Sequence, residues 1–132
     1  MTDAMMKKMI TRAKQASAKA YCPYSRFHVG AAVLTASGEI VTGCNVENAS
    51  YGLTICAERN AIFHTIATGE QEIVAVVIYT PTEQPTAPCG ACRQVINEFG
   101  PQARIVCVCD GSERIDMQIT NLLPRAFGLN AI

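Results

Sequence analysis

Three cysteines and one glutamate stand in two short stretches that together could hold a metal ion. Glu58 follows Cys56 by two residues, and Cys89 and Cys92 form a C-x-x-C pair further along the chain. Cysteine thiolates are soft ligands that select zinc over magnesium or calcium. Three such ligands leave the fourth position of a tetrahedral zinc open, which is typical of a catalytic site. The ion would lower the pKa of a water in that position towards neutrality.

Glu58 could exchange a proton with that water. The sequence predicts a helix that begins at Cys56, which places Glu58 on the first turn beside the thiol. An acidic residue on a first helical turn also interacts favourably with the helix dipole without any chemistry. The three cysteines that could converge on the same place favour the catalytic interpretation.

The charge of a three-thiolate site needs compensation. A divalent ion with three thiolates carries a net negative charge, which weakens it as a Lewis acid. Helix N-termini at Cys56 and Cys89 would offset part of that charge. Arg59 could donate a hydrogen bond to a thiolate and offset more, and Arg93 is a second candidate. Arg59 could equally be an ordinary surface cation or the partner of an acidic side chain.

The C-x-x-C pair has two other interpretations, a redox dithiol and one half of a four-thiol structural zinc site. A structural site needs a second pair, and only Cys107 and Cys109 offer one, with both side chains on one face of a strand. The histidines, His28 and His64, lack ligand spacing to each other. We interpret the four remaining cysteines as small packed apolar residues: Cys22, Cys44, Cys107 and Cys109.

Length and composition indicate one globular domain over residues 1–132. The chain has 132 residues and a formal net charge of zero, so nothing favours nucleic acid as a partner. It has no run of about 18 apolar residues, which a membrane span would need, and no secretory signal pattern. An odd count of seven cysteines argues against a secreted disulfide framework. We expect a cytoplasmic protein without a membrane partner.

The predicted elements indicate an α/β fold with a single mixed sheet of about five strands. The apolar run over residues 73–80 is typical of a strand that helices bury on both faces. Strands that follow helical crossovers run parallel, so we expect helices on both faces of the sheet, in three α/β/α layers. The predicted helices cover residues 2–20, 56–68, 89–99 and 121–127, and the strands cover residues 29–35, 40–46, 73–80, 104–109 and 115–120.

A group of polar residues follows the second predicted strand: Asn45, Glu47, Asn48 and Ser50. These residue types are common in turns and need no function there. Strand ends and loops also carry the hydrogen-bonding groups of binding pockets. The residues alone leave both interpretations open.

Two stretches resemble those of the zinc-dependent nucleoside and nucleobase deaminases. They are Cys56-Ala57-Glu58 and Pro88-Cys89-Gly90-Ala91-Cys92-Arg93-Gln94. Residues 21–32, 43–49 and 122–128 are similar to the small homotetrameric cytidine deaminases, and the likeness extends from about residue 20 to the end. The resemblance implies one zinc per subunit held by Cys56, Cys89 and Cys92, with Glu58 as the proton shuttle.

The resemblance also implies a substrate-binding set: Phe27, Asn45, Val46, Glu47, Ala57 and Phe127. In it, Asn45 and Glu47 would hydrogen-bond the ribose hydroxyls, and Phe27 would pack on the pyrimidine. The backbone of Ala57 would contact the base. Phe127 would reach into the pocket of a neighbouring subunit of a homotetramer, which places the active sites at subunit interfaces. Arg59 matches a residue that offsets thiolate charge.

The implied activity is hydrolytic deamination of cytidine and 2′-deoxycytidine to uridine and deoxyuridine, with release of ammonia, in pyrimidine salvage. A zinc-bound hydroxide would attack C4 of cytosine. Glu58 would protonate N3 and then the departing amine, as base and then acid.

Two alternatives remain at this stage. A deaminase of another cytosine-containing nucleoside, such as an antibiotic, would share the three-cysteine site, whereas related deaminases of other bases have histidine at the place of Cys56. The second alternative is a zinc-stabilised structural module without turnover. Glu58 and the missing fourth ligand argue against it.

Overall fold

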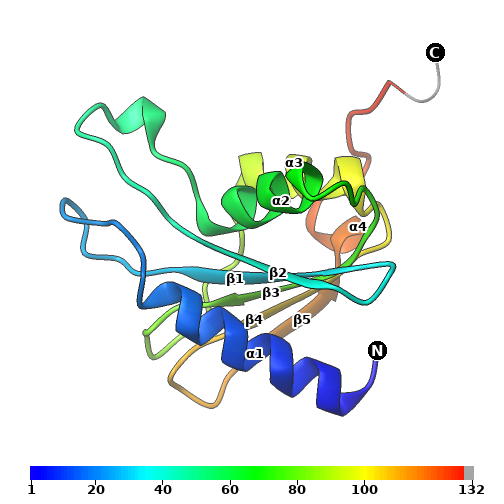
Figure 1. Ribbon diagram of the computed structural model, residues 1–132, viewed down its shortest axis with the longest axis horizontal. Helices are drawn as coiled ribbons and strands as arrows, with labels where there is room; N and C mark the ends of the chain where they lie inside the picture. The colour runs from blue at the N-terminus through cyan, green and yellow to red at the C-terminus, as the bar shows by residue number, and fades with distance from the viewer. Residues whose placement is uncertain (130–132) are drawn as a thin grey trace.

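Five strands form one mixed sheet in the computed structural model, which describes residues 1–129 (Figure 1). The strands are β1 (Gly30–Thr35), β2 (Ile40–Cys44), β3 (Ile73–Tyr79), β4 (Arg104–Val108) and β5 (Ile115–Gln118). Their order in the sheet is β2-β1-β3-β4-β5. Strand β1 pairs antiparallel with β2 and β3, β3 pairs parallel with β4, and β4 pairs antiparallel with β5. The prediction of a single mixed sheet is confirmed.

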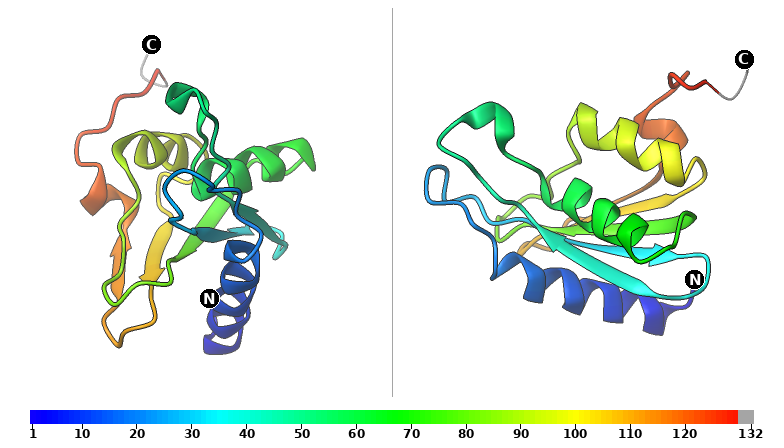
Figure 2. Two further views of the ribbon diagram at one scale, coloured as in Figure 1. Left: turned by 90° about the vertical axis from the view of Figure 1, so that its left-hand side faces the viewer. Right: turned by 45° about the horizontal axis from the view of Figure 1, so that its top comes forward.

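Helices cover both faces of this sheet, as predicted (Figure 2). They are α1 (Asp3–Ser17), α2 (Ala57–Ala67), α3 (Gly90–Phe99) and the short α4 (Ile119–Leu122), with a single 3₁₀ turn at Tyr51–Leu53. Helix α1 lies on one face, and α2, α3 and α4 lie on the other (Figures 1 and 2). Within residues 1–129 no helix has the length and apolar character that crossing a bilayer requires.

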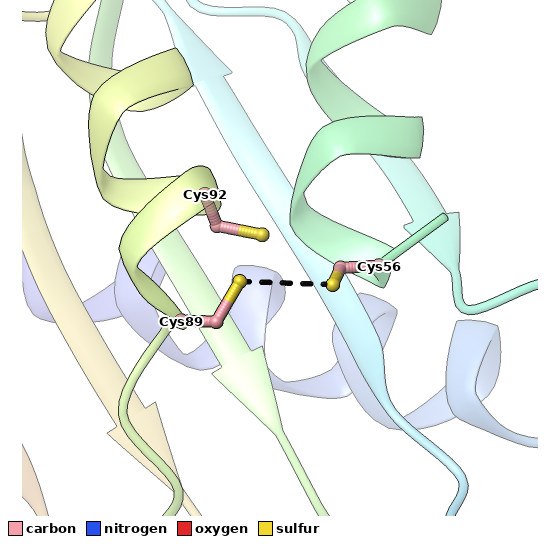
Figure 3. A group of neighbouring side chains, drawn as sticks. All are labelled: Cys56, Cys89 and Cys92. Atoms are coloured by element: carbon pink, nitrogen blue, oxygen red, sulfur yellow. Dashed lines mark hydrogen bonds between the residues drawn. The ribbon is translucent and has the colours of Figure 1, made fainter. Parts of the chain in front are cut away.

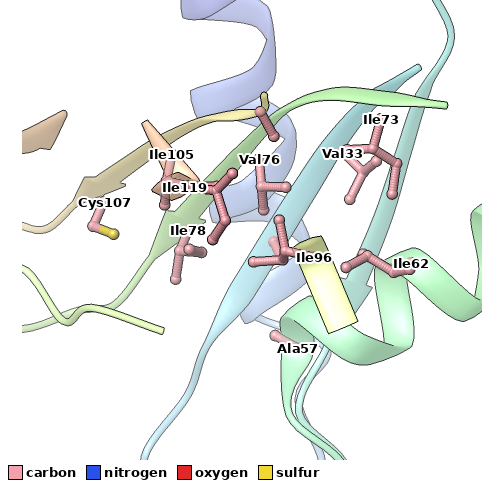
Figure 4. Close-up of a cluster of buried hydrophobic side chains, with 13 residues drawn as sticks. Val33, Ala57, Ile62, Ile73, Val76, Ile78, Ile96, Ile105, Cys107 and Ile119 are labelled. Carbon is pink, nitrogen blue, oxygen red and sulfur yellow. The ribbon is translucent and has the colours of Figure 1, made fainter. Parts of the chain in front are cut away.

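The central strand β3 contributes to two separate cores, which explains its continuous apolar run. Successive side chains of a strand point to opposite faces. Val76 and Ile78 pack under α2 and α3 together with Ile62 and Ile96 (Figure 4). The alternate residues of β3 pack against α1 in a cluster that includes Met6, Met9, Ala13, Ala75 and Val77.

Two glycines let helices approach the sheet closely. A Cβ atom on Gly43 of β2 would lie 2.4 Å from the backbone N of Ala61 and 2.8 Å from the carbonyl oxygen of Ala57 in α2. A Cβ atom on Gly30 of β1 would lie 1.9 Å from the carbonyl oxygen of Ala13 in α1. Any larger residue would therefore displace backbone, and the first turn of α2 is held directly against the sheet.

The C-terminal helix begins earlier than predicted and is shorter. We expected residues 121–127 with Asn121 as the cap, whereas α4 follows β5 at once and Gln118 is its N-cap residue. Ile119 is fully buried in the core, and its N–H donates to the carbonyl of Ala103 at 2.9 Å. Burial of Ile119 thus fixes where the helix starts. The predicted strand over residues 115–120 ends at Gln118 for the same reason.

Candidate active site

The three predicted metal ligands meet where two helices begin (Figure 3). Cys56 is the N-cap residue of α2, Cys89 is the N-cap residue of α3, and Cys92 lies in the first turn of α3. Neither N-cap side chain makes a capping hydrogen bond to the backbone of its helix, so neither sulfur is used as a cap. The three sulfurs lie within 4.8 Å of one another, and those of Cys56 and Cys89 are 3.9 Å apart.

These sulfurs fit a zinc ion. Zn–S bonds of about 2.3 Å in tetrahedral geometry separate two sulfurs by about 3.8 Å, close to the observed spacing of Cys56 and Cys89. Hydrogen bonds from Cys92 and Arg59 lower the pKa of the Cys56 thiol to about 5. The pKa of Cys92 is raised because it shares its hydrogen with Cys56 and is buried. Thiolate character is therefore already present at the ligand that opens α2.

The two arginines that follow the ligands have different contacts. Arg59 Nη2 donates to the Cys56 sulfur at 3.3 Å, and this bond is the main reason that the pKa of Arg59 is raised. The buried Arg59 Nε has no partner among residues 1–129. Arg93 instead donates to the carbonyl oxygens of Pro88 at 2.8 Å and Leu122 at 2.9 Å. Arg93 therefore ties the ligand loop to the C-terminal segment, and Arg59 is the arginine beside a thiol.

Glu58 lies on the first turn of α2, beside the sulfur cluster. Its side chain is only 5% exposed. Desolvation raises the pKa of Glu58 to about 7, so both its protonated and its ionised form are accessible near neutral pH. A buried carboxyl with such a pKa is suited to accept and release protons.

A cavity of about 280 Å³ opens in front of the sulfurs and Glu58. The predicted residues that line it are Cys56, Cys89, Glu58, Ala57, Phe27, Asn45 and Glu47. The sequence interpretation gave no role to the other lining residues, which are Ser25, Val29, Thr54, Ile78, Thr86 and Ala87. Cavity-lining groups thus come from the first turn of α2, from the end of β3, and from the loops before β1, after β2 and before α3.

Asn45 and Glu47 face the cavity because they extend the alternation of β2 beyond its last residue. Both are buried, whereas Val46 between them is 44% exposed. Asn45 Oδ1 accepts the N–H of Val29 at 2.9 Å, and Asn45 Nδ2 donates to the carbonyl of Phe27 at 2.7 Å. The polar cluster that the sequence left open is therefore part of the cavity wall at these two positions.

Val46 and Phe127 belong to the predicted set but do not line this cavity. The side chain of Val46 lies on the side of the segment opposite Asn45 and Glu47, because successive side chains of an extended segment alternate. Phe127 is 71% exposed on the segment after α4, where its carbonyl accepts a hydrogen bond from Gln94 Nε2 at 3.0 Å.

The remaining cysteines lie away from the cluster. Cys22 is buried and Cys44 is half-buried. Cys107 packs in the core beneath α2 and α3. Cys109 is buried beyond the end of β4, where its thiol lies 3.4 Å from the carbonyl oxygen of Glu83. None of these four joins the metal cluster found within residues 1–129.

Fold and site together define a class of enzyme: a three-layer α/β/α zinc hydrolase with a three-thiolate centre and an adjacent buried glutamate. The family model described as the cytidine and deoxycytidylate deaminase zinc-binding region matches residues 4–109, and this chain belongs to that family.

Similar proteins agree with this assignment. The chain is 47% identical over 122 residues to a cytidine deaminase of Halalkalibacterium halodurans, covering 90% of this chain and 91% of the relative. The crystal structure of a cytidine deaminase from Burkholderia pseudomallei is 45% identical with a TM-score of 0.89, covering 96% of this chain and 100% of that one. A cytidine deaminase structure from Mycobacterium tuberculosis is 43% identical with a TM-score of 0.83, covering 98% and 100%.

Proposed function

We propose that the chain hydrolyses cytidine to uridine and ammonia, with 2′-deoxycytidine as a second substrate. One observation carries the proposal: two of the three converging cysteines, Cys56 and Cys89, form with the buried Glu58 one wall of a cavity that Phe27, Asn45 and Glu47 also line. The relatives that share the fold over almost the whole chain carry the name cytidine deaminase. The cavity accordingly combines a hydrolytic centre with groups suited to a base and a sugar.

The acid–base work falls to Glu58. Cys56, Cys89 and Cys92 would hold a zinc ion, which would supply the Lewis acidity that makes water nucleophilic at neutral pH. The raised pKa of Glu58 allows it to take the proton of that water and to deliver protons to N3 of the base and to the departing amine. Arg59 offsets the charge of the ligands through its bond to the Cys56 sulfur.

The other side of the cavity recognises the nucleoside. Asn45 and Glu47 are the acceptors and donors for the ribose hydroxyls, and Phe27 packs on the base. The backbone of Ala57, at the start of α2, contacts the polar edge of the pyrimidine. Val46 contributes through its backbone pairing, which keeps the residues on either side turned towards the cavity.

We further propose a homotetramer of single-domain chains, located in the cytoplasm. Phe127 is strongly exposed and lies outside the cavity of its own chain, which supports a role in the pocket of a neighbour. Further exposed large apolar side chains would be covered on assembly: Tyr51, Leu53, Phe63 and Val74.

The test compares substrates and one variant. The purified protein should release ammonia from cytidine and deoxycytidine, and lose this activity with a chelator. Glu58→Ala should keep its zinc, measured by metal analysis, and lose nearly all turnover. A near wild-type rate in Glu58→Ala contradicts the role of Glu58. One bound zinc without ammonia release would indicate a structural module, and activity confined to a modified cytosine nucleoside would indicate another substrate.

A further inference from the structure

The Ser25 hydroxyl lies between two proposed recognition groups, the carboxylate of Glu47 and the aromatic residue Phe27. Ser25 Oγ donates a hydrogen bond to Glu47 Oε2 and accepts one from the backbone N–H of Phe27 at 3.0 Å. A hydroxyl has one hydrogen, and an ionised carboxylate can only accept. The direction of both bonds is therefore fixed, from Phe27 through Ser25 to Glu47.

The Glu47 carboxylate receives further donors from the same loop. Its Oε1 accepts the backbone N–H groups of Tyr24 at 3.0 Å and Ser25 at 3.1 Å. The single ion pair within residues 1–129 joins Arg104 and Asp116, so hydrogen bonds rather than a cation compensate Glu47. The bond from the Ser25 hydroxyl is the main cause that lowers the pKa of Glu47. The loop thus holds the carboxylate ionised and in one orientation.

The backbone between Ser25 and Phe27 is in a left-handed conformation that residues other than glycine rarely adopt. Arg26 has a φ of 58°. Such a conformation persists where the surrounding structure fixes it. Ser25 is fixed by Glu47 on one side, and the carbonyl of Phe27 is fixed by Asn45 on the other. This turn directs Phe27 to the wall of the cavity.

We propose that Ser25 is a positioning residue that couples ribose recognition to base recognition. Its hydroxyl holds the Glu47 carboxylate and the Phe27 backbone in one arrangement, so a nucleoside meets both groups already aligned. The inference rests on the proposed function, because it needs Glu47 to bind a ribose hydroxyl and Phe27 to pack on the base. Loss of alignment weakens substrate binding, so it affects KM more than kcat.

The test uses Ser25→Ala with two substrates, cytidine and 2′,3′-dideoxycytidine, which lacks both ribose hydroxyls of the sugar ring. Removal of a hydrogen bond to a charged group typically lowers an equilibrium constant by about 10-fold or more. We expect kcat/KM for cytidine to fall by about 10-fold, mostly through KM. For dideoxycytidine the fall should be at least about threefold smaller, because the carboxylate has no hydroxyl to bind. Zinc content should be unchanged.

The chain offers a matched control in Ser37. Its hydroxyl donates to Glu70 Oε1 at 2.6 Å, which is the same kind of bond at an exposed position outside the cavity. Ser37→Ala should leave both substrates unaffected. Ser25→Cys, which keeps a weak donor, should give a smaller loss on cytidine than Ser25→Ala. In a Glu47→Gln background, Ser25→Ala should lower kcat/KM for cytidine by a smaller factor than it does in the unmodified protein.

Three results would overturn the coupling: equal losses on both substrates, additive losses in the double variant, or an unchanged KM for cytidine. Should Ser25→Ala fail to fold by circular dichroism, the same substrate comparison on Ser25→Cys decides. Absence of ammonia release by the unmodified protein would instead overturn the proposed function. Activity in the unmodified protein with equal losses in Ser25→Ala overturns only the role of Ser25.

Discussion

The two sides of the cavity are built in different ways. On the metal side, Cys56, Cys89 and Cys92 stand at the N-termini of two helices that pack on the sheet. On the rim, Phe27 lies in a loop before β1. Its place depends on two hydrogen bonds: its carbonyl accepts one from Asn45 Nδ2, and its N–H donates one to Ser25 Oγ. The geometry of the metal side is set by helix N-termini that pack on the core. The geometry of the rim is set by hydrogen bonds between side chains and backbone.

Because of this difference, substitutions on the two sides should affect different properties of the enzyme. Changes on the metal side should lower kcat and zinc affinity, because they act on the hydrolytic centre. Changes on the rim should raise KM and lower stability, because the rim binds the substrate and its bonds also hold the loop. The following variants test that division, from the largest expected effect to the smallest.

Replacement of a ligand should have the largest effect. Outer-shell partners of a metal already contribute about 10- to 100-fold to affinity or activity, so Cys92→Ala should reduce turnover by more than about 100-fold. Zinc content by metal analysis should fall in parallel. Cys109→Ala, a buried thiol outside the cluster, serves as the control and should retain zinc. A Cys92→Ala protein with full zinc and activity would contradict the assignment of the centre.

Arg59→Ala should lower kcat by about 10- to 100-fold, the usual cost of losing an outer-shell partner. Its bond to the Cys56 sulfur offsets ligand charge, and its removal leaves that sulfur more electron-rich. Steady-state kinetics and competition with a zinc chelator measure the two effects. Arg12→Ala, at a half-buried position on α1 outside the cavity, is the control. An effect confined to KM would place Arg59 with the rim instead.

Asn45→Ala should damage the rim without removing the metal. The N–H of Val29 and the carbonyl of Phe27 would both lose a side-chain partner. A fully buried group left unsatisfied costs about 1–3 kcal/mol, and because these two bonds are only partly buried, the loss should lie towards the lower end of that range. We expect a lower midpoint of thermal unfolding and a raised KM, with zinc content intact. Asn48→Ala, at an exposed position, is the matched control, and equal kcat losses in both variants would refute this division.

Ionisation of Glu47 should make a small contribution to the pH dependence of the free energy of unfolding. Hydrogen bonds from Ser25 and Tyr24 lower its pKa in the folded state. Its contribution to stability is therefore complete above the unfolded pKa of about 4.3 and is lost as the pH falls through the lower folded value. As the pH falls through this range, the free energy of unfolding should decrease less for Glu47→Gln than for the unmodified protein. Urea unfolding at several pH values measures this. The exposed Glu113→Gln is the control and should behave like the unmodified protein.

The metal side could be predicted from the sequence because its information is local. Cys56 with Glu58, and Cys89 with Cys92, each lie within one helical turn. Helix starts place such side chains in a defined way, and the apolar run of β3 indicates a buried central strand. The order of helices and strands along the chain could be predicted from the same patterns.

The rim could be predicted only in part, because its geometry depends on loops. The alternation at the end of β2 is visible in the sequence, and it would have placed Val46 on the side opposite Asn45 and Glu47. The left-handed conformation of Arg26 has no comparable signal, so the bridging position of Ser25 stayed hidden. Thr86 and Ala87 also reach the cavity through a loop whose course depends on tertiary packing.

The distance between the ligands along the chain has a consequence for unfolding. Cys56 and Cys89 are 33 positions apart, and the intervening segment contains α2 and β3. An ion that stayed bound to both thiolates would close this segment into a loop in the unfolded chain as well. Loop closure of that length removes chain entropy worth about 4 kcal/mol in the simple polymer estimate. The metal centre would therefore also act as a cross-link that stabilises the fold. Removal of the ion by a chelator should lower the free energy of unfolding.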